Sequence, residues 1–369
     1  MAADQSARAR AKIATLDVAA YTIPTDKPES DGTLAWDKTT LVRVEVTAAG
    51  VRGWGWSYAD VATARLVGDK LRGEVVGRDA MDVGGAFVAM ATSVRNVGRA
   101  GVASMAISAV DVALWDLKAR LLGVALVDLF GAVRDAAPVY GSGGFCSYTD
   151  AELQAQLGGW VEQGIPRVKM KIGREPERDR ARVAAARAAA GKAELFVDAN
   201  GAYSRKQAKQ LGDAFWQEAG VRWLEEPVSS DDLAGLQTLV RELPMDVAAG
   251  EYGYTPWYFR RMLEAGAVDV LQADATRCGG YTGFLAAAAL CDAYGVPLSS
   301  HCAPSLHAAI ACAASRLVHM EWFHDHVRIE RMLLDGFIAA TGGAVRPDRA
   351  RPGHGYEWKA KDAEKFRVT

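Results

Sequence analysis

Long apolar runs are missing from this 369-residue sequence, and so are closely spaced cysteine pairs. Without an uncharged apolar stretch of about 20 residues, no segment is expected to span a membrane. The cysteines are odd in number and form no CxxC pair, which favours free thiols in a reducing compartment. They are Cys146, Cys278, Cys291, Cys302 and Cys312.

A secretory leader and an excess of one charge are also missing. The N-terminal segment MAADQSARARAKIATLDV is basic but has no apolar core, so we expect no signal peptide and a cytoplasmic protein. A formal net charge of −2 gives no reason to expect nucleic acid or an anionic membrane as a partner. Half of the residues are hydrophobic, and the length suits a globular enzyme with one large and one smaller domain.

The first third of the chain predicts a separate α+β domain over residues 1–132. Strands are expected at KIATLDVAAY, TTLVRVEVTA and GWGWSY, and the intervening YTIPTDKPESDGTLAW has the composition of a loop. Apolar spacing becomes helical between about 60 and 130, where Ile107, Val110, Leu114 and Leu117 follow a step of three to four residues. Gly123 is the expected end of that helix.

From Pro138 onward, short apolar runs alternate with helical segments. The candidate strands are PVYGSG, RVKMKIG, ELFVDAN, VRWLEEP, MDVAAGE, VDVLQAD, VPLSSH and VHMEWF. Eight strands and seven intervening helices predict an α/β fold, a modified TIM barrel of the (β/α)7β type, over residues 133–334. The tail, residues 335–369, has no role left in the barrel and is expected to pack back on the N-terminal domain.

Three carboxylates end successive strands of this barrel. Asp198, Glu225 and Glu251 close the runs LFVDAN, RWLEEP and DVAAGE, which recur roughly every 25 residues. A single such acid is most simply a solvated loop residue, but parallel strands bring all three to one rim. Oxygen ligands gathered there suit a hard divalent cation, above all Mg²⁺. Asn200 shares a face with Asp198 and could orient it or touch the water shell of the metal.

Two lysines lie on the strand before these acids. Alternation turns Val168, Met170 and Ile172 toward the outer helices, and Lys169 and Lys171 into the barrel. Surface lysines are the usual alternative, but the interleaved apolar residues argue against it. A lysine beside another cation in a partly dry site should lose its proton more easily and could then act as a base.

A second candidate acid/base lies on the other side of the barrel. Asp274 and His301 end neighbouring strands, so the carboxylate could fix the imidazole tautomer and raise its basicity. A buried histidine bound to a backbone carbonyl is the alternative. Glu321 should face inward and, if protonated, could donate a hydrogen bond to a substrate, although an ion pair to a lysine or arginine is the other option. Strand alternation should turn the side chains of Cys302 and Glu226 away from the barrel interior. We therefore assign no chemistry to Cys302 and expect a structural role for Glu226.

The remaining histidines have no visible partner and are expected to be structural. They are His307, His319, His324, His326 and His354.

Together these motifs resemble the enolase superfamily, and within it the mandelate racemase-like subgroup. The KxK of Lys169 and Lys171, the DxN of Asp198, EEP at Glu225 and GE at Glu251 match in order. Asp274, His301 and Glu321 complete the pattern, and ISAVDVALWDLKARLLG matches in the N-terminal region.

The resemblance implies a capping domain, built from the N-terminal region and the tail, over the barrel. It also implies a homo-oligomer and one Mg²⁺ per subunit, held by the three acids. A base, either Lys171 or His301, would remove the proton alpha to a substrate carboxylate to give an enediolate. The metal, Lys169 and Glu321 would offset the developing charge.

The fate of that enediolate stays open in the sequence. The resemblance implies a lid near residues 22–36. Here that segment is polar and ends at Trp36, which suits a polyhydroxylated acid. Trp54, Trp56 and Tyr58 could form one wall of the site or simply the core of the domain. An acid-sugar dehydratase is therefore our hypothesis. The alternatives are a racemase or epimerase of a 2-hydroxy acid, a cycloisomerase of a sugar-acid lactone, a barrel that only binds, and a metal-dependent hydrolase, whose sites usually have histidine ligands.

Overall fold

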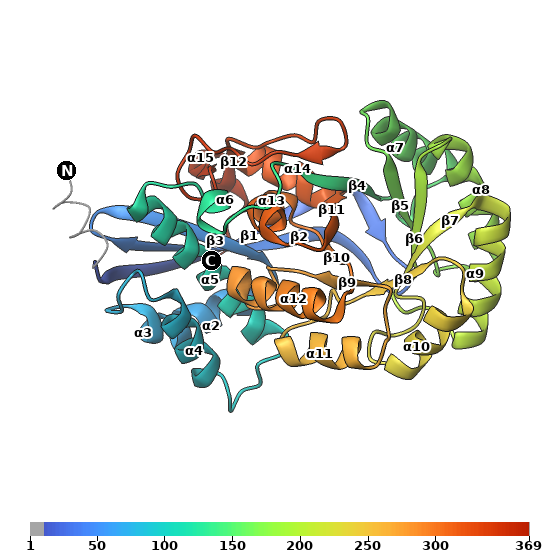
Figure 1. Cartoon of the computed structure of the whole chain (residues 1–369). Coiled ribbons are helices and arrows are strands. Elements are labelled where there is room, and N and C mark those ends of the chain that lie inside the picture. The colour runs from blue at the N-terminus through green and yellow to red at the C-terminus, as the bar shows by residue number, and fades with distance from the viewer. Residues whose placement is uncertain (1–10, 369) are drawn as a thin grey trace.

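The computed structural model describes residues 11–368, so residues 1–10 of the basic N-terminal segment, and Thr369, lie outside it. The chain begins with an antiparallel sheet of three strands, β1 (Ile13–Ser30), β2 (Ala35–Ala48) and β3 (Val51–Tyr58), in that order. The sheet and its helices form one end of the molecule, and helices of the barrel form the other (Figure 1).

The stretch predicted as a loop between the first two strands is mostly a β-hairpin. β1 pairs with β2 in register as far as Pro24 opposite Lys38, shifts, and resumes with Glu29 opposite Trp36. The register shift accommodates two prolines, which lack the N–H that a ladder needs. Pairing with a neighbouring strand therefore outweighs the loop-like composition. Residues 24–38 form a two-stranded hairpin arm that extends beyond the sheet.

The capping sheet is covered by helices that carry a core of their own. They are α2 (Val61–Leu66), the π-helix η1 (Val67–Leu71), α3 (Arg72–Val75), α4 (Val83–Ser93), α5 (Val102–Leu122) and α6 (Leu126–Leu129). Ile107, Val110, Leu114 and Leu117 of α5 are all buried, as their spacing predicted. Gly123 ends α5 in a left-handed conformation with φ 71°.

Helix α5 lies unusually close to β3. A Cβ atom on Gly53 would come within 2.3 Å of the backbone nitrogen of Leu117. Only glycine leaves room for this approach, so the sequence of β3 sets the distance between the sheet and its helix.

Eight parallel strands form a closed barrel, which confirms the predicted fold class. The strands are β4 (Ala137–Gly143), β5 (Arg167–Lys171), β6 (Glu194–Asp198), β7 (Val221–Glu225), β8 (Asp246–Ala249), β9 (Val270–Ala273), β10 (Leu298–Ser300) and β11 (Leu317–Phe323). The connecting helices are α7 (Asp150–Glu162), α8 (Pro176–Ala190), α9 (Arg205–Ala219), α10 (Leu233–Glu242), α11 (Pro256–Glu264), α12 (Gly280–Tyr294) and α13 (Pro304–Ala313). Neighbours in sequence are neighbours in the sheet, and β11 pairs with β4 to close it.

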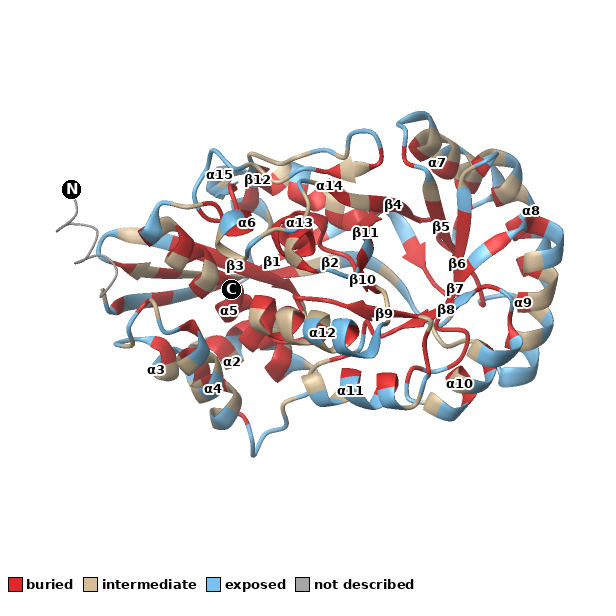
Figure 2. Cartoon of the chain, viewed as in Figure 1, coloured by how far each residue is buried: buried red, intermediate tan, exposed pale blue. Residues whose placement is uncertain are grey.

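Apolar side chains fill the interior of the barrel away from its carboxyl end. Tyr140, Phe196, Trp223, Ala248 and Val270 form one buried cluster there. The strands are buried almost throughout, and α8, α9 and α10 turn exposed faces outward (Figure 2). The interior is thus a packed core, and polar chemistry is confined to the rim where the strands end.

The chain after β11 departs from expectation in two ways. Helix α14 (His324–Leu333) follows β11 directly, although no last helix was predicted. The short strand β13 (Ala344–Val345) pairs antiparallel with β4, so part of the tail does join the barrel sheet. The rest consists of β12 (Leu334–Asp335), β14 (Glu357–Trp358), α15 (Ala360–Ala363) and η2 (Glu364–Phe366).

The tail also binds the capping domain. The backbone N–H of His354 donates to Asp116 of α5 over 2.9 Å, and Arg120 donates to the carbonyl oxygen of Tyr356 over 2.9 Å. Across residues 11–368, no helix has both the length and the apolarity required to cross a membrane.

Candidate active site

A cavity of about 430 Å³ opens at the carboxyl ends of the barrel strands, beneath the capping domain. Its barrel wall includes Lys171, Asn200, Glu251, Asp274, Arg277, His301, Cys302 and Glu321, and its capping wall includes Trp36, Lys38, Thr39 and Tyr58. Strand ends from opposite sides of the barrel thus meet residues of the hairpin arm in a single space.

The three predicted ligand residues converge. Asp198 and Glu225 end adjacent strands in register, and Glu251 lies two residues beyond β8. All three are buried, and one carboxylate oxygen of each lies within 4.8 Å of the others. Gly250, with φ 136°, permits the turn to Glu251, because a Cβ there would lie 2.1 Å from the carbonyl oxygen of Gln272.

The electrostatics of this cluster fit a cation. Burial and the neighbouring Asp198 raise the pKa of Glu225 to about 8. Glu251 Oε2 is buried without a hydrogen-bond partner among the described residues. Buried acceptors of like charge are costly unless a positive ion lies between them. Three carboxylates without an imidazole or thiolate suit a hard divalent ion.

Asn200 lies beside the cluster, as its place after Asp198 indicated. Its backbone N–H donates to Asp198 Oδ1 over 2.9 Å, and φ of 45° turns the chain sharply at this point. The side-chain oxygen lacks a hydrogen-bond partner within residues 11–368 and lines the cavity. Asn200 therefore orients Asp198 through its backbone and leaves its side-chain oxygen for a ligand.

Both lysines point into the barrel. Lys169 Nζ lies 2.6 Å from Glu225 Oε1 and 2.8 Å from Glu321 Oε1, and Lys171 Nζ hydrogen-bonds to Asp198. The expectation of a lowered lysine pKa was wrong for this structure. Burial acts to lower the pKa of Lys171, but the Asp198 carboxylate outweighs it and the neighbouring Lys169, so the pKa is raised.

His301 and Asp274 form a hydrogen-bonded pair. Asp274 Oδ2 lies 2.7 Å from His301 Nδ1, and the other ring nitrogen, Nε2, is 3.4 Å from Glu251 Oε2. Burial acts to lower the pKa of His301, but Glu251 and the hydrogen bond to Asp274 raise it overall. The nearby His307 accepts a hydrogen bond from the backbone N–H of Ala275 over 2.9 Å, which supports its structural assignment.

Glu321 forms the ion pair that was the alternative to a protonated donor. Its Oε1 accepts a hydrogen bond from Ser142 Oγ over 2.6 Å and faces Lys169, and its Oε2 accepts from the backbone N–H of Cys302 over 2.7 Å. Burial acts to raise its pKa, yet Lys169 and His301 hold the pKa well below its usual range. The predicted role as a protonated donor is therefore wrong for this structure.

Cys302 was expected to face away, and this is also wrong. Its Sγ lies 3.2 Å from His301 Nε2 and it lines the cavity. Cys302 and Ala303 have φ values of 50° and 41°, so the strand alternation that the prediction assumed has already ended. Burial raises the pKa of the Cys302 thiol well above its usual value. A neutral thiol therefore packs against the imidazole.

Sequence reasoning missed Arg277. Its Nη1 lies 3.3 Å from Glu251 Oε1, and its Nε lies 3.7 Å from Asp274 Oδ2. The guanidinium links a candidate metal ligand to the partner of His301. Its spacing, three residues after Asp274, was the only signal in the sequence.

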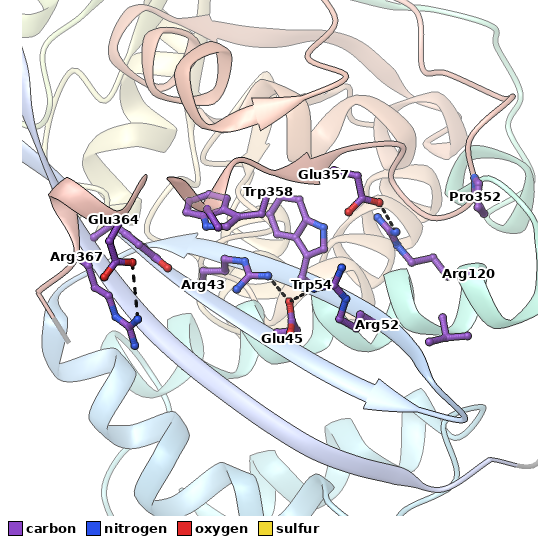
Figure 3. A pocket seen from close by; sticks show the side chains of 13 residues that line it. Arg43, Glu45, Arg52, Trp54, Arg120, Pro352, Glu357, Trp358, Glu364 and Arg367 are labelled. Atoms are coloured by element: carbon purple, nitrogen blue, oxygen red, sulfur yellow. Dashed lines mark hydrogen bonds and ion pairs between the residues drawn. The ribbon is translucent and has the colours of Figure 1, made fainter. Parts of the chain in front are cut away.

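Two of the aromatic residues proposed for the lid and the substrate wall reach the cavity. Trp36 lines it, as does Tyr58, whose ring stacks on His326 with centroids 3.4 Å apart. Trp54 does not. It stacks on Trp56 and lines a separate cavity against the tail, near Arg43 and Trp358 (Figure 3). Tyr58 lies four positions further along the strand, a distance of about 13 Å.

The fold and this site define a class of protein: a barrel enzyme that places a lysine and a histidine around a buried three-carboxylate cation site, under a capping domain. Family models identify the class more closely. Residues 15–131 match the mandelate racemase / muconate lactonizing enzyme N-terminal domain, and residues 152–363 match the enolase C-terminal domain-like family. The chain belongs to the mandelate racemase/muconate lactonizing enzyme family of the enolase superfamily.

Relatives of known structure or activity span nearly the whole chain. A mandelate racemase/muconate lactonizing enzyme-like protein from Rubrobacter xylanophilus is 52% identical with a TM-score of 0.95, over 97% of this chain and 100% of that one. The 3,6-anhydro-alpha-L-galactonate cycloisomerase of Streptomyces coelicolor is 34% identical over 85% of this chain and 87% of its own.

A dehydratase is similar at a comparable level. The L-talarate/galactarate dehydratase of Salmonella typhimurium is 31% identical over 85% of this chain and 83% of its own. Its crystal structure with Mg and L-lyxarohydroxamate has a TM-score of 0.90 over 99% of this chain and 95% of that one.

Proposed function

We propose that this protein is a Mg²⁺-dependent acid-sugar dehydratase. The observation that carries the proposal is the position of the two candidate bases. Asp198, Glu225 and Glu251 form a row of carboxylates along three neighbouring strands. Lys171 contacts Asp198 at one end of this row, and His301 approaches Glu251 at the other. A substrate carboxylate held over the row would therefore present opposite faces of its alpha carbon to the two residues.

Asp198, Glu225 and Glu251 are the residues that would hold Mg²⁺, which supplies electrostatic stabilisation of the charge that develops on the substrate carboxylate. The ammonium group of Lys169 would add to that stabilisation, and Glu321 holds the lysine in place from 2.8 Å. Lys169 is thus assigned the role of the donor and Glu321 the role of its positioning partner.

The reaction requires two proton transfers. The C–H bond alpha to the carboxylate breaks, and its proton passes to Lys171 or His301, according to the configuration of that carbon. A cation held by Asp198 would offset the charge that raises the pKa of Lys171 and so favour the neutral amine that this step requires. His301, as imidazolium, then gives a proton to the hydroxyl group on the beta carbon. The C–O bond breaks, water leaves, and the resulting enol becomes a 2-keto-3-deoxy acid.

The walls of the cavity support a polyhydroxylated substrate. Lys38, Thr39 and Asn200 offer polar groups, and Arg277 and Tyr252 line the same space. Trp36 and Tyr58 add flat apolar surfaces of the kind that pack on sugar carbons. This mixture fits an aldonic or aldaric acid better than an aromatic acid such as mandelate.

A cycloisomerase of a sugar-acid lactone or anhydro acid is the second candidate. The observation that favours it is the 34% identity to the cycloisomerase of Streptomyces coelicolor. Such a reaction begins with the same proton removal and expels a ring oxygen instead of water.

A substrate panel distinguishes the two candidates. The purified protein with Mg²⁺ is incubated with diastereomeric aldonic and aldaric acids, and separately with sugar-acid lactones and anhydro acids, in D₂O. Keto-acid formation from an acyclic acid supports the dehydratase, and ring opening without loss of water supports the cycloisomerase. Deuterium entry at the alpha carbon with neither product would indicate a racemase or epimerase and overturn the proposal.

A further inference from the structure

The arm of the capping hairpin meets the barrel at a second cluster of metal-binding side chains. Asp26 and Glu29 lie in and beside the register shift of β1, and His324 is the first residue of α14. His324 Nε2 lies 2.9 Å from Asp26 Oδ2. One donor atom from each of the three residues lies within 4.8 Å of the other two.

Glu29 provides an independent observation that points to a ligand. The residue is only 1% exposed, and its Oε2 accepts a hydrogen bond from Trp36 Nε1 over 2.8 Å. Its Oε1 is buried with no hydrogen-bond partner in the described part of the chain. Burial, with Asp325 and Asp26 nearby, raises the pKa of Glu29 to about 8. A buried acceptor among like charges is stabilised by a cation.

We propose that Asp26, Glu29 and His324 form a second metal site, for a divalent first-row transition ion such as Zn²⁺, that fastens the hairpin arm to the barrel. Metal–ligand bonds of about 2.1 Å give ligand–ligand edges of about 3.0 to 3.4 Å in octahedral and tetrahedral sites. The 2.9 Å hydrogen bond between His324 and Asp26 already holds these two donor atoms at about that spacing, and a bound ion would replace the proton between them. An imidazole beside two carboxylates selects Zn²⁺ over Mg²⁺.

The site would couple metal binding to the position of the arm. Two ligands come from the hairpin and one from α14, so all three meet only where the arm lies against the barrel. Trp36, which holds Glu29, also lines the active-site cavity. Binding at this site therefore stabilises one wall of that cavity. The inference does not depend on which reaction the barrel performs.

Calorimetric titration of Zn²⁺ into the full-length protein in excess Mg²⁺ tests the assignment, because Mg²⁺ then competes at the all-oxygen cluster. We expect about one zinc per chain for the wild type. H324Q and D26N should each raise the Kd for this zinc ion at least tenfold. Titration with Co²⁺ gives a second readout, a visible absorption band that H324Q should lose. Among the described residues, His301, Cys302 and Glu321 form another candidate group with an imidazole, and H324Q leaves that group intact, so binding lost in H324Q belongs to the arm site.

K27Q is the matched control, because Lys27 lies between the ligands in sequence and binds Glu152 instead. K27Q should bind zinc like the wild type, and E29Q offers a further ligand variant if either of the others misfolds by circular dichroism. The assignment is overturned if the wild type binds no zinc in excess Mg²⁺, or if H324Q and D26N bind it as well as the wild type does. Equal loss in K27Q would also contradict it, since arm packing would then control binding.

Discussion

At the scale of single residues, the candidate site depends on charges that hold one another in place. Lys169 contacts Glu225 and Glu321, Lys171 contacts Asp198, and His301 is oriented by Asp274. Alternation along short strands was sufficient to place these residues at one rim, but only the pairing of Asp274 with His301 was predicted. The states of protonation were harder to predict, because they depend on the balance between burial and several charges that only the folded chain brings together.

His301→Asn should separate the two proton transfers. Loss of the imidazole removes the group assigned to protonate the leaving hydroxyl, so kcat for dehydration should fall by about 10² to 10⁴-fold. Exchange of the alpha proton with solvent deuterium, followed by NMR, should persist where Lys171 is the base. Dehydration at the wild-type rate in H301N would remove His301 from the mechanism.

At the scale of elements, close packing between the capping sheet and α5 depends on a missing side chain. Gly53→Ala would press a Cβ against the backbone of Leu117 and should destabilise the protein by about 1–3 kcal/mol. The measurement is the midpoint of urea unfolding followed by tryptophan fluorescence.

Gly159→Ala in α7 is the control for this change. No atom lies within 4 Å of a Cβ at that position, so the only effect is on helix propensity. G159A should stabilise the protein by about 0.5–1 kcal/mol. If both variants shift the midpoint in the same direction, packing at Gly53 is not what limits the approach of α5.

The junction between α5 and α12 should make stability depend on pH. Asp111 is buried in α5 and accepts hydrogen bonds from the backbone N–H and hydroxyl of Thr282, over 3.0 and 2.6 Å. Burial raises its pKa from 3.8 to about 7. The folded state therefore holds this proton more tightly than the unfolded state. The resulting stability is complete below about pH 4 and is lost as the pH rises through 7.

Asp111→Asn removes that titration and is compared with the wild type between pH 4 and 8. The wild type should lose up to about 4 kcal/mol relative to D111N across this range. Urea unfolding at each pH measures the difference. A difference that stays constant with pH, or grows in favour of the wild type, would contradict the raised pKa.

At the scale of the whole molecule, the tail binds both domains. β13 extends the barrel sheet beside β4, and the segment near His354 packs on α5. Asp116 is the central residue: its carboxylate accepts hydrogen bonds from the backbone N–H groups of Trp54 and His354 and from Arg120. Residues of β3, α5 and the tail thus all donate hydrogen bonds to the same buried carboxylate.

Asp116→Ala should therefore destabilise the whole protein, by about 3–5 kcal/mol, because it leaves Arg120 and two buried N–H groups without that acceptor. The thermal midpoint and urea midpoint are the measurements. Glu264→Ala, which breaks an exposed helical ion pair with Arg260, is the control and should change stability by no more than about 0.5 kcal/mol. Similar effects of the two variants would show that the tail docks without help from Asp116.

The sequence by itself determined the barrel and most of its rim. Strand alternation and the spacing of Asp198, Glu225 and Glu251 depend only on local geometry and on parallel strands ending at one edge, so they could be predicted without coordinates. The length of the hairpin arm could not, because pairing with β2 outweighed its loop-like composition. Nor could the positions of Cys302 and Trp54.

Tertiary structure alone decided these features because each depends on a distant partner or on backbone that leaves the regular pattern. Positive φ values turn Cys302 toward His301, and Trp54 lines a separate cavity between the capping sheet and the tail. The same holds for the cluster of Asp26, Glu29 and His324, whose members are joined only when the arm reaches the barrel. Local periodicity carries no information about contacts between segments so far apart in the chain.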